Sequence, residues 1–206
     1  MKTTEKKIIV TLLLGIIFFP SVSAKPKELA TKYSLHMLGV YVGELSVIQT
    51  NNNGNVNIEA ITDIKVNLPF PYRIKYVQNT KYKQGVLQHS HVKTYKNGKL
   101  NSNMRLDFVK GLYQLVTDED TTIIIDSITY SGSLLYFNEP STIKRIYNER
   151  RAEMRRITPV YERTYIIKDE KERELNRYYY ENGILQSAKM RHTLGTLELN
   201  RVNEQQ

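Results

Sequence analysis

Two histidines spaced two residues apart are the first candidates for chemistry in this chain of 206 residues. His89 and His91 fall in a strand-like segment, where side chains at positions i and i+2 project from the same face of a sheet. Two imidazoles on one face could share a metal ion, but a zinc centre needs three or four donors. Since His36 and His192 are distant in the sequence, we expect a half-buried or solvent-facing pair, with no metal and no other cofactor.

Catalytic motifs give little support for an enzyme. The sequence has no Gly-x-Ser-x-Gly motif, no cysteine and no glycine-rich phosphate-binding loop. Carboxylates in or near the predicted strands could pair for acid–base catalysis, but their spacing is equally typical of surface charge: Glu44, Asp63, Asp107 and Asp126. We therefore predict a non-enzymatic protein. A hydrolase is an alternative, which Asp107 or another carboxylate facing the two histidines would favour.

Tyrosine and arginine side chains are the candidates for ligand binding. The chain has 15 tyrosines, whose rings can line an apolar cavity while their hydroxyls bind water or a ligand. Tyrosine is also a favoured strand residue, so the core and the sheet surface are the alternative places for these side chains. The run Arg150–Arg156 contains four arginines that could clamp a phosphate or carboxylate headgroup. The alternative is a charged end of a hairpin.

The N-terminus has the layout of a secretory signal peptide. Three lysines within the first seven residues precede the apolar run Ile8–Phe19, which ends in the segment Pro20–Ala24. This apolar run has 12 residues, fewer than the roughly 20 that a membrane-spanning helix needs. Small side chains before Lys25 predict cleavage between Ala24 and Lys25, and an uncleaved N-terminal anchor is the alternative. Residues 25–206 are then a single exported domain, most naturally in a bacterial periplasm.

Composition limits the partners of this domain. Removing the leader, with its three lysines and one glutamate, lowers the formal net charge from +9 to +7. The positive charge is scattered along the chain, so we predict no nucleic-acid partner, and solubility or a mild attraction to anionic lipid headgroups explains the excess. The absence of cysteine excludes disulfides and cysteine-based metal or haem sites. No second apolar run is long enough to span a membrane, so we expect the cleaved protein not to be integral to it.

The elements that position these residues are predicted to be strands. From Lys32 onward, short β-branched and aromatic runs alternate with turn signals, a pattern typical of an all-β sandwich or barrel. The turn signals are Asn51–Asn55, Asn97-Gly98, Lys110-Gly111, Asp118–Asp120 and Asn182-Gly183. Because each turn joins neighbours in the sequence, we predict an antiparallel meander that forms a curved sheet or open β-barrel, with at most one or two short helices.

Side-chain alternation assigns faces to individual strands. Tyr72, Ile74 and Tyr76 share one face of a strand, and the basic residues between them share the other. The run Ile123–Ile125 is apolar on both faces, which predicts a central strand.

Three further segments depart from simple alternation. Pro69 and Pro71 remove two backbone donors around Phe70, which predicts a bend, an edge or a bulge. The apolar and aromatic segment Ser133–Pro140 could form one helical turn, which the proline would end. The charged segment Lys168–Arg177 is predicted to be a solvated connection.

Several of these segments occur together in a known family. They are Tyr33-Ser34-Leu35 with Gly39–Glu44, then Val92–Gly98, Ser133–Pro140 and Tyr178–Leu185, in this order. This arrangement resembles the exported bacterial family called domain of unknown function 6134, with a looser likeness to family 3108. The resemblance covers nearly the whole mature chain and implies a periplasmic, β-rich fold, a curved sheet or open barrel like those of lipoprotein and lipid carriers. It implies no activity and supplies no functional residues.

The leading hypothesis is an exported cell-envelope protein that binds a lipid-like or other hydrophobic ligand without changing it. Burial of the ligand in a cavity of the curved sheet would contribute about 25 cal/mol per Å² of apolar surface. The predicted contacts are Tyr72, Ile74 and Tyr76 as the cavity wall and Leu134, Leu135 and Phe137 as a plug or lid. The alternative is a structural or adaptor protein that binds another envelope protein through its sheet surface or an exposed edge. That alternative predicts a solid core without a cavity.

Overall fold

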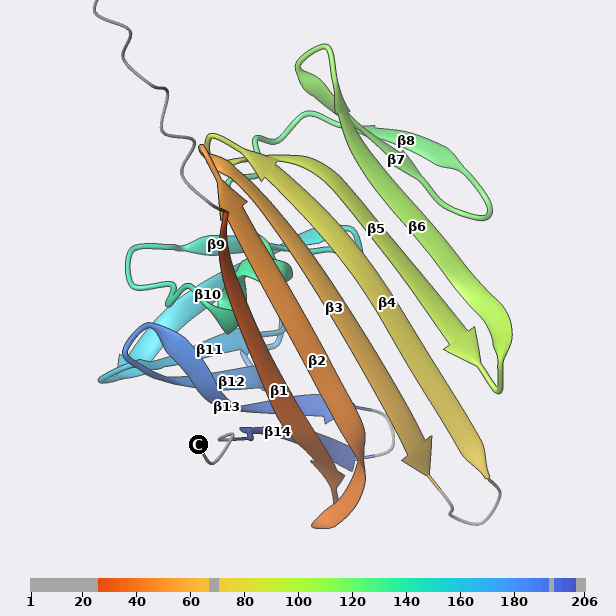
Figure 1. Ribbon diagram of the computed structural model, residues 1–206, viewed down its shortest axis with the longest axis vertical. Coiled ribbons are helices and arrows are strands. Elements are labelled where there is room, and N and C mark those ends of the chain that lie inside the picture. The colour runs from red at the N-terminus through yellow and green to blue at the C-terminus, as the bar shows by residue number, and fades with distance from the viewer. Residues whose placement is uncertain (1–25, 67–70, 193–194, 203–206) are drawn as a thin grey trace, which may run out of the picture.

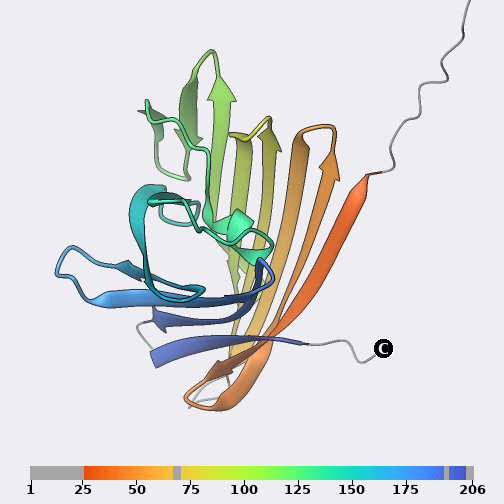
Figure 2. The same cartoon turned by 90° about the vertical axis from the view of Figure 1, so that its left-hand side faces the viewer.

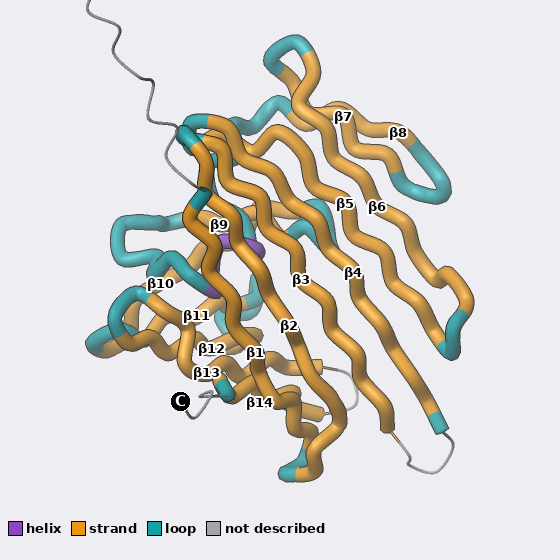
Figure 3. Tube along the Cα trace, viewed as in Figure 1, coloured by secondary structure: helices purple, strands orange, loops and turns teal. Residues whose placement is uncertain are grey.

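The computed structural model describes residues 26–66, 71–192 and 195–202. Within these residues the chain forms 14 strands and one short 3-10 helix, which confirms the prediction of an all-β fold (Figures 1 and 3). The predicted cleavage point at Ala24 and Lys25 and the predicted bend at Phe70 lie outside the described residues. The elements are β1 Lys27–Met37, β2 Val40–Asn52, β3 Asn55–Val66, β4 Tyr72–Lys83, β5 Val86–Lys96, β6 Lys99–Val109, β7 Leu112–Val116, β8 Thr121–Ile124, η1 Gly132–Tyr136, β9 Arg145–Asn148, β10 Glu153–Tyr161, β11 Thr164–Lys168, β12 Glu174–Glu181, β13 Ile184–His192 and β14 Gly195–Arg201.

The strands form one continuous antiparallel sheet. Its order is β8-β7-β6-β5-β4-β3-β2-β1-β14-β13-β12-β11-β10-β9, so almost every strand pairs with its neighbour in sequence, as a meander requires. The exception is the pairing of β1 with β14, where Tyr33 lies opposite Arg201. Strands β8 and β9 are therefore the two free edges of the sheet.

The sheet folds into two layers at the β1–β14 pairing. Strands β1 to β6 run side by side as a tall layer, and β10 to β14 lie crosswise behind its lower part (Figures 1 and 2). Between the layers, the larger core cluster takes side chains from both, among them Leu35, Leu45, Ile58, Tyr180 and Leu199. Alternating side chains of each strand supply this core, because successive residues point to opposite faces of a sheet.

Tight turns of the predicted kind connect the long strands. At the β5–β6 turn, Asn97 and Gly98 both have positive φ angles, of 49° and 81°. Both central residues of a type I′ hairpin turn need this conformation, which asparagine tolerates and glycine adopts freely. The β1–β2 turn has the same backbone signs, but its first position holds Leu38, with φ 52°.

Two sequence predictions about strands are corrected by the structure. The run Ile123–Ile125 is not a central strand, because β8 is a free edge and the Ile123 and Ile125 side chains are 53% and 82% exposed. The segment Lys168–Arg177 is only in part a connection, because β11 reaches Lys168 and β12 begins at Glu174. Asp169 closes the short turn between them by accepting hydrogen bonds from the backbone N–H groups of Lys171 and Arg173, both at 2.9 Å.

The chain between the two free edges, residues 125–144, is called here the crossing segment. It contains η1, which confirms a helical turn in this segment, but η1 ends at Tyr136, so Pro140 does not end it as predicted. Its backbone carbonyl of Ile128 accepts from the N–H of Leu87 in β5 at 2.9 Å, and that of Tyr130 accepts from Tyr147 in β9 at 2.9 Å. The crossing segment thus connects both ends of the sheet without pairing β8 to β9.

Candidate functional site

The crossing segment lies between the two layers of the sheet. On the tall layer, the Nδ2 atom of Asn138 donates to Gln49 Oε1 in β2 at 3.3 Å. On the second layer, the hydroxyl of Tyr180 in β12 donates to the Leu135 carbonyl at 2.9 Å. The hydroxyl of Tyr165 in β11 donates to Glu139 Oε1 at 2.8 Å. These contacts bring the segment into the space that the folded sheet encloses.

The predicted lid residues face this enclosed space. Leu135 is buried in the larger core cluster, and Leu134 and Phe137 are partly buried against it. The three positions are therefore brought together on η1 and its C-terminal flank, with their apolar side chains packed on the interior.

The three predicted wall residues have different surroundings in the structure. Ile74 packs against the same core cluster as the lid residues. The rings of Tyr72 and Tyr76 instead have cations over them, with Lys96 Nζ 5.1 Å from the Tyr72 centroid and the Arg150 guanidinium 4.7 Å from that of Tyr76. Cations at these distances are attracted to the negative face of the ring.

A buried carboxylate holds the start of η1. Glu149, directly after β9, accepts hydrogen bonds from the backbone N–H groups of Gly132, at 3.1 Å, and Ser133, at 3.0 Å. The Ser131 hydroxyl donates to the same carboxylate. Burial raises the pKa of Glu149, and the hydrogen bonds from Ser131 and Ser133 oppose this shift. A Cβ atom at Gly132 would lie 2.9 Å from Glu149 Oε2, so a larger residue there would displace the carboxylate.

The hydrogen-bonded group of Glu149, Ser131 and Ser133 is called the anchor. Hydroxyl groups extend it into the tall layer. The Tyr82 hydroxyl in β4 donates to Ser131 Oγ at 2.7 Å, and the Oγ atoms of Ser131 and Ser133 lie 3.0 Å apart. Ser131 and Ser133 are fully buried, so no substrate can reach these hydroxyls in this conformation. The arrangement is therefore an anchor for the crossing segment rather than an activated nucleophile.

Sequence reasoning missed this anchor. In the sequence, Glu149 stands next to an arginine-rich run and resembles an ordinary charged turn residue. The only local signal was Ser131-Gly132-Ser133 before the apolar residues of η1, because serines and glycine are favoured where a helical turn begins.

The histidine pair is on one face, as predicted, and each ring has its own partner. His89 Nδ1 lies 2.6 Å from Asp107 Oδ1, and His91 Nε2 lies 2.7 Å from Asn103 Oδ1. Arg105 also binds Asp107, with Nε 2.9 Å from Oδ2. Among the described residues, no group of three or more His, Asp or Glu side chains has the geometry to hold a metal ion. The carboxylate that would favour a hydrolase is thus present, but it is already paired with an arginine.

The arginine-rich run is distributed over separate contacts. Arg150 lies over the Tyr76 ring, whereas Arg155 and Arg151 both approach Glu153, at 2.7 and 4.0 Å. These side chains lie at the β9–β10 turn and the start of β10, so the run forms the charged end of a hairpin.

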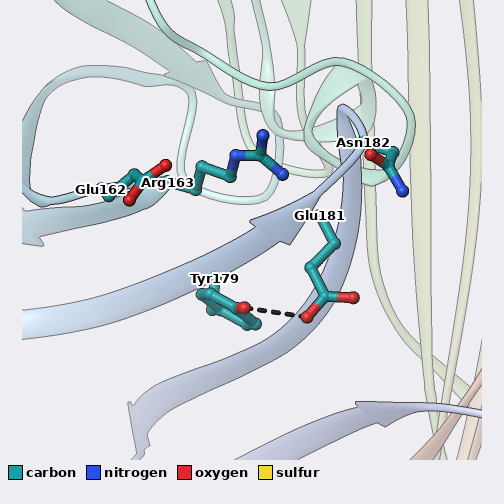
Figure 4. Close-up of a pocket in the computed structure, with 5 residues that line it drawn as sticks. All are labelled: Glu162, Arg163, Tyr179, Glu181 and Asn182. Atoms are coloured by element: carbon teal, nitrogen blue, oxygen red, sulfur yellow. Dashed lines mark hydrogen bonds between the residues drawn. The ribbon is translucent and has the colours of Figure 1, made fainter.

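The outer surface of the described residues includes the following two hollows. The first, of about 360 Å³, is lined by Glu162, Arg163, Tyr179, Glu181 and Asn182, and the Tyr179 hydroxyl donates to Glu181 at 2.8 Å there (Figure 4). The second, of about 320 Å³, is lined by Arg73, Lys75, Val77, Tyr95 and Gly98. Neither hollow contains any of the six predicted ligand contacts.

A single open antiparallel sheet, folded over a tyrosine-rich interior and spanned on its open side by one segment, defines a β-barrel-like protein. The fold is similar to that in a crystal structure of a β-barrel-like protein of domain of unknown function DUF1849 from Brucella abortus, with a TM-score of 0.55 and 11% sequence identity. The match covers 86% of this chain and 96% of that one. At this identity the likeness shows the fold alone.

The chain itself belongs to the family described as domain of unknown function (DUF6134), whose model matches residues 33–202. This match confirms the resemblance to family 6134, whereas the looser likeness to family 3108 stays a prediction. No curated protein matches the chain. Within the described residues, no helix has the length and apolar character to cross a membrane.

Proposed function

We propose that this protein is an exported, non-catalytic protein of the cell envelope that binds a lipid-like or other hydrophobic molecule between its two layers. The observation that carries the proposal is the open side of the sheet. Strands β8 and β9 do not pair, and the crossing segment spans the space between them with Leu135 turned into the core. Opening the interior at this segment breaks the single bridge between Ser131 and Tyr147 but none of the pairings between the 14 strands.

Ligand binding would replace the apolar side chains of the crossing segment with an apolar group of the ligand. When the crossing segment moves outward, it uncovers the core side chains against which Leu134 and Phe137 pack. An acyl chain or aromatic group that takes their place would regain about 25 cal/mol for each Å² of apolar surface removed from water. The binding energy therefore depends on shape and burial, not on a charged headgroup.

The anchor at Glu149 determines how readily the segment moves. Its carboxylate, with the hydroxyls of Ser131 and Tyr82, holds the start of η1 through hydrogen bonds, and the side chains of Tyr130 and Leu135 beside it are buried in the larger core cluster. Each net hydrogen bond contributes about 0.5–1.5 kcal/mol, and opening the segment also exposes its buried apolar side chains, so a bound ligand must offset both costs.

Export and the absence of catalysis are parts of the same proposal. The leader pattern in residues 1–24 supports export, and a chain without cysteine needs no oxidising compartment for its stability. The buried Ser131–Glu149 pair and the arginine-bound Asp107 support a protein that does not transform its ligand.

The first experiment is native mass spectrometry of the protein purified from its own cell envelope, followed by lipid extraction. Wild-type protein should carry a co-purifying apolar molecule. Leu135→Asp and the milder Phe137→Asp, which changes a partly buried side chain, should lower the amount bound at least about tenfold, since a change of 1.4 kcal/mol is tenfold in affinity.

The matched control is Ile123→Asp, which places the same charge on an exposed isoleucine outside the interior and should leave the bound molecule unchanged. Circular dichroism identifies which variants are folded. A folded Phe137→Asp protein that still carries the wild-type amount would show that the crossing segment is not the lid.

A second candidate function, an adaptor for another envelope protein, is favoured by the free edge β8. One side of this strand has no strand partner, and the exposed Ile123 lies on it beside the exposed Ile125. Unpaired edges with apolar side chains can accept a strand from another protein. Crosslinking in the host cell should then yield a defined partner that Ile123→Lys releases, and an unchanged partner in that variant would argue against the edge.

A further inference from the structure

The hairpin between β1 and β2 carries an exposed apolar tip. Leu38, Val40 and Tyr41 are 75%, 58% and 54% exposed. All three lie within four consecutive residues, whereas single exposed apolar side chains scattered over a surface are normal and carry no information. The tip is therefore an apolar cluster that the fold presents to its surroundings.

The turn chemistry of this tip is unfavourable for the fold itself. Leu38 has φ 52° and Gly39 has φ 77°. The same first position holds Asn53, Asn97 and Asn182 in three other turns, and Gln84 and Lys110 in two more, each with a similar positive φ, so Leu38 is the only apolar residue among these six. Asparagine tolerates this conformation better than leucine does. An apolar side chain in this conformation that is still 75% exposed indicates a use outside the folded chain.

Cationic side chains gather at the same end of the sheet. By register, β3 ends and β4 begins beside the β1–β2 turn, since Gly43 lies opposite Ile64 and Val66 lies opposite Tyr72. There the hydrogen-bonded Arg73 guanidinium holds the pKa of Asp63 below its usual value, and Lys65 and Lys75 lower it further. Three cations thus surround one carboxylate.

The next hairpin adds to this charge and provides a hollow. Lys96 and Lys99, which flank the β5–β6 turn, are exposed. The hollow of about 320 Å³ that is lined by Arg73, Lys75, Val77, Tyr95 and Gly98 opens on the same part of the sheet. Arg73 already pairs with Asp63, so the Lys75 ammonium and the tyrosine ring are the groups of the hollow that suit an anionic headgroup on an apolar anchor.

We propose that this end of the sheet docks on the surface of an anionic phospholipid bilayer, with Leu38, Val40 and Tyr41 inserted and Lys65, Lys75 and Lys99 on the headgroups. In Figure 1 the β1–β2 turn and the β5–β6 turn lie along the lower edge of the tall layer. Three strand spacings separate β2 from β5, about 14 Å at about 4.8 Å each. Tip and cations therefore reach one patch of membrane. Apolar insertion combined with lysine attraction is how peripheral proteins bind anionic lipids.

This docking does not depend on the interior site proposed above. It involves the turn end of the strands rather than the crossing segment, so the two proposals fail separately. A protein that lacks a bound apolar molecule can still dock, and a protein that carries one can still remain in solution.

The chain contains no tryptophan, so a single introduced indole reports on its own surroundings. We expect Val40→Trp to show a blue-shifted emission on vesicles that contain about 30% phosphatidylglycerol, and quenching by brominated acyl chains. Ile123→Trp places the same probe at an exposed position on β8 and should show neither change. All variants keep the N-terminus that the secreting cell leaves, verified by mass spectrometry.

Two variants that should weaken vesicle binding separate the apolar from the electrostatic contribution to that binding. Leu38→Asn should weaken vesicle binding about threefold to tenfold and at the same time raise the unfolding midpoint, because asparagine suits the turn. The double change Lys75→Gln with Lys99→Gln should weaken binding to anionic vesicles by a similar factor without affecting neutral phosphatidylcholine vesicles.

Binding to anionic vesicles that neither loss variant reduces would overturn the proposal, as would the same emission from both tryptophan variants. A third contrary result is a concentration-dependent dimer that Leu38→Asn dissociates while no form of the protein binds vesicles. That result would assign the tip to a second copy of the chain.

Discussion

A single carboxylate, Glu149, shows how this protein tolerates a buried charge. Both of its oxygens accept hydrogen bonds, Oε1 from the Ser133 N–H and Oε2 from the Gly132 N–H, and the Ser131 hydroxyl is a third donor. Burial disfavours the ionised form, and the donors favour it. The pKa of the carboxyl is nevertheless raised, so desolvation is the larger of the two effects.

The raised pKa of Glu149 predicts that the free energy of unfolding depends on pH. The folded protein binds a proton at Glu149 more tightly than the unfolded chain does, so the stability from this group is greatest below the ordinary glutamate pKa. It is lost as the pH rises through the higher folded pKa. The difference in unfolding free energy between wild type and Glu149→Gln should therefore shrink as the pH rises, which urea unfolding at a series of pH values measures.

At neutral pH, Glu149→Gln should still destabilise the fold, by about 1–3 kcal/mol, because its amide NH₂ then faces the N–H of Gly132 or Ser133. Glu153→Gln, at a half-buried glutamate paired with Arg155, is the control for the loss of a carboxylate outside the anchor. A wild-type advantage that grows with pH would contradict the raised pKa.

At the scale of elements, backbone geometry in β2 limits how closely the strands can approach. Gly43 has φ 153°, and a Cβ atom placed there would lie 1.9 Å from the carbonyl oxygen of Asp63 in β3. The register between β1 and β2 also shifts between Leu35 and His36, opposite this position. The irregularity bends the edge of the tall layer where it meets β14, and such bends are typical of bulges in curved sheets.

The change Gly43→Ala should consequently disturb the pairing of β2 with β3 and cost more than about 3 kcal/mol, since the atom it meets belongs to the backbone. Thermal unfolding followed by circular dichroism measures the loss. Gly98→Ala is the matched control, because it has a positive φ but no neighbour within 4 Å of the new Cβ, and we expect a cost of about 1 kcal/mol. Equal losses in the two variants would mean that φ alone, not the contact with β3, makes Gly43 necessary.

Elements were also the scale at which the sequence was most informative. Local signals such as Asn97-Gly98 predicted the turns correctly, because a turn depends on the conformation of two residues. The assignment of Ile123–Ile125 to a central strand was wrong because position in a sheet depends on distant partners. Side-chain alternation placed Tyr72, Ile74 and Tyr76 on one face but could not show that cations cover two of the rings.

For the whole molecule, the pairing of β1 with β14 joins segments more than 160 residues apart, as in the pair Ser34 and Asn200. No local pattern predicts such a contact, so the sequence indicated a curved sheet or open barrel but not where it folds into two layers. The Glu149 anchor was missed for the same reason, since Tyr82, which donates to Ser131 of the anchor, lies in β4.

The topology predicts an order of amide protection. Strands β1 and β14 hold the ends of the described chain but lie in the middle of the sheet, whereas β8 and β9 are its edges. Hydrogen exchange followed by mass spectrometry should therefore show slower exchange in β1 and β14 than in β8 and β9, because exchange follows local opening and not distance from a terminus. Faster exchange in β14 than in β8 would mean that the two layers separate readily at their junction.

Because β1 pairs with β14, the sheet can be completed only after β14 has been synthesised. Strand β1 is synthesised first and must wait for β14 before its second edge is covered. A product that stops before Gly195 would leave both β1 and β13 with an unpaired edge, and exposed edges invite proteases and aggregation. A defective, shortened chain is thus distinguished from a finished one by its own backbone hydrogen bonds, without any dedicated recognition sequence.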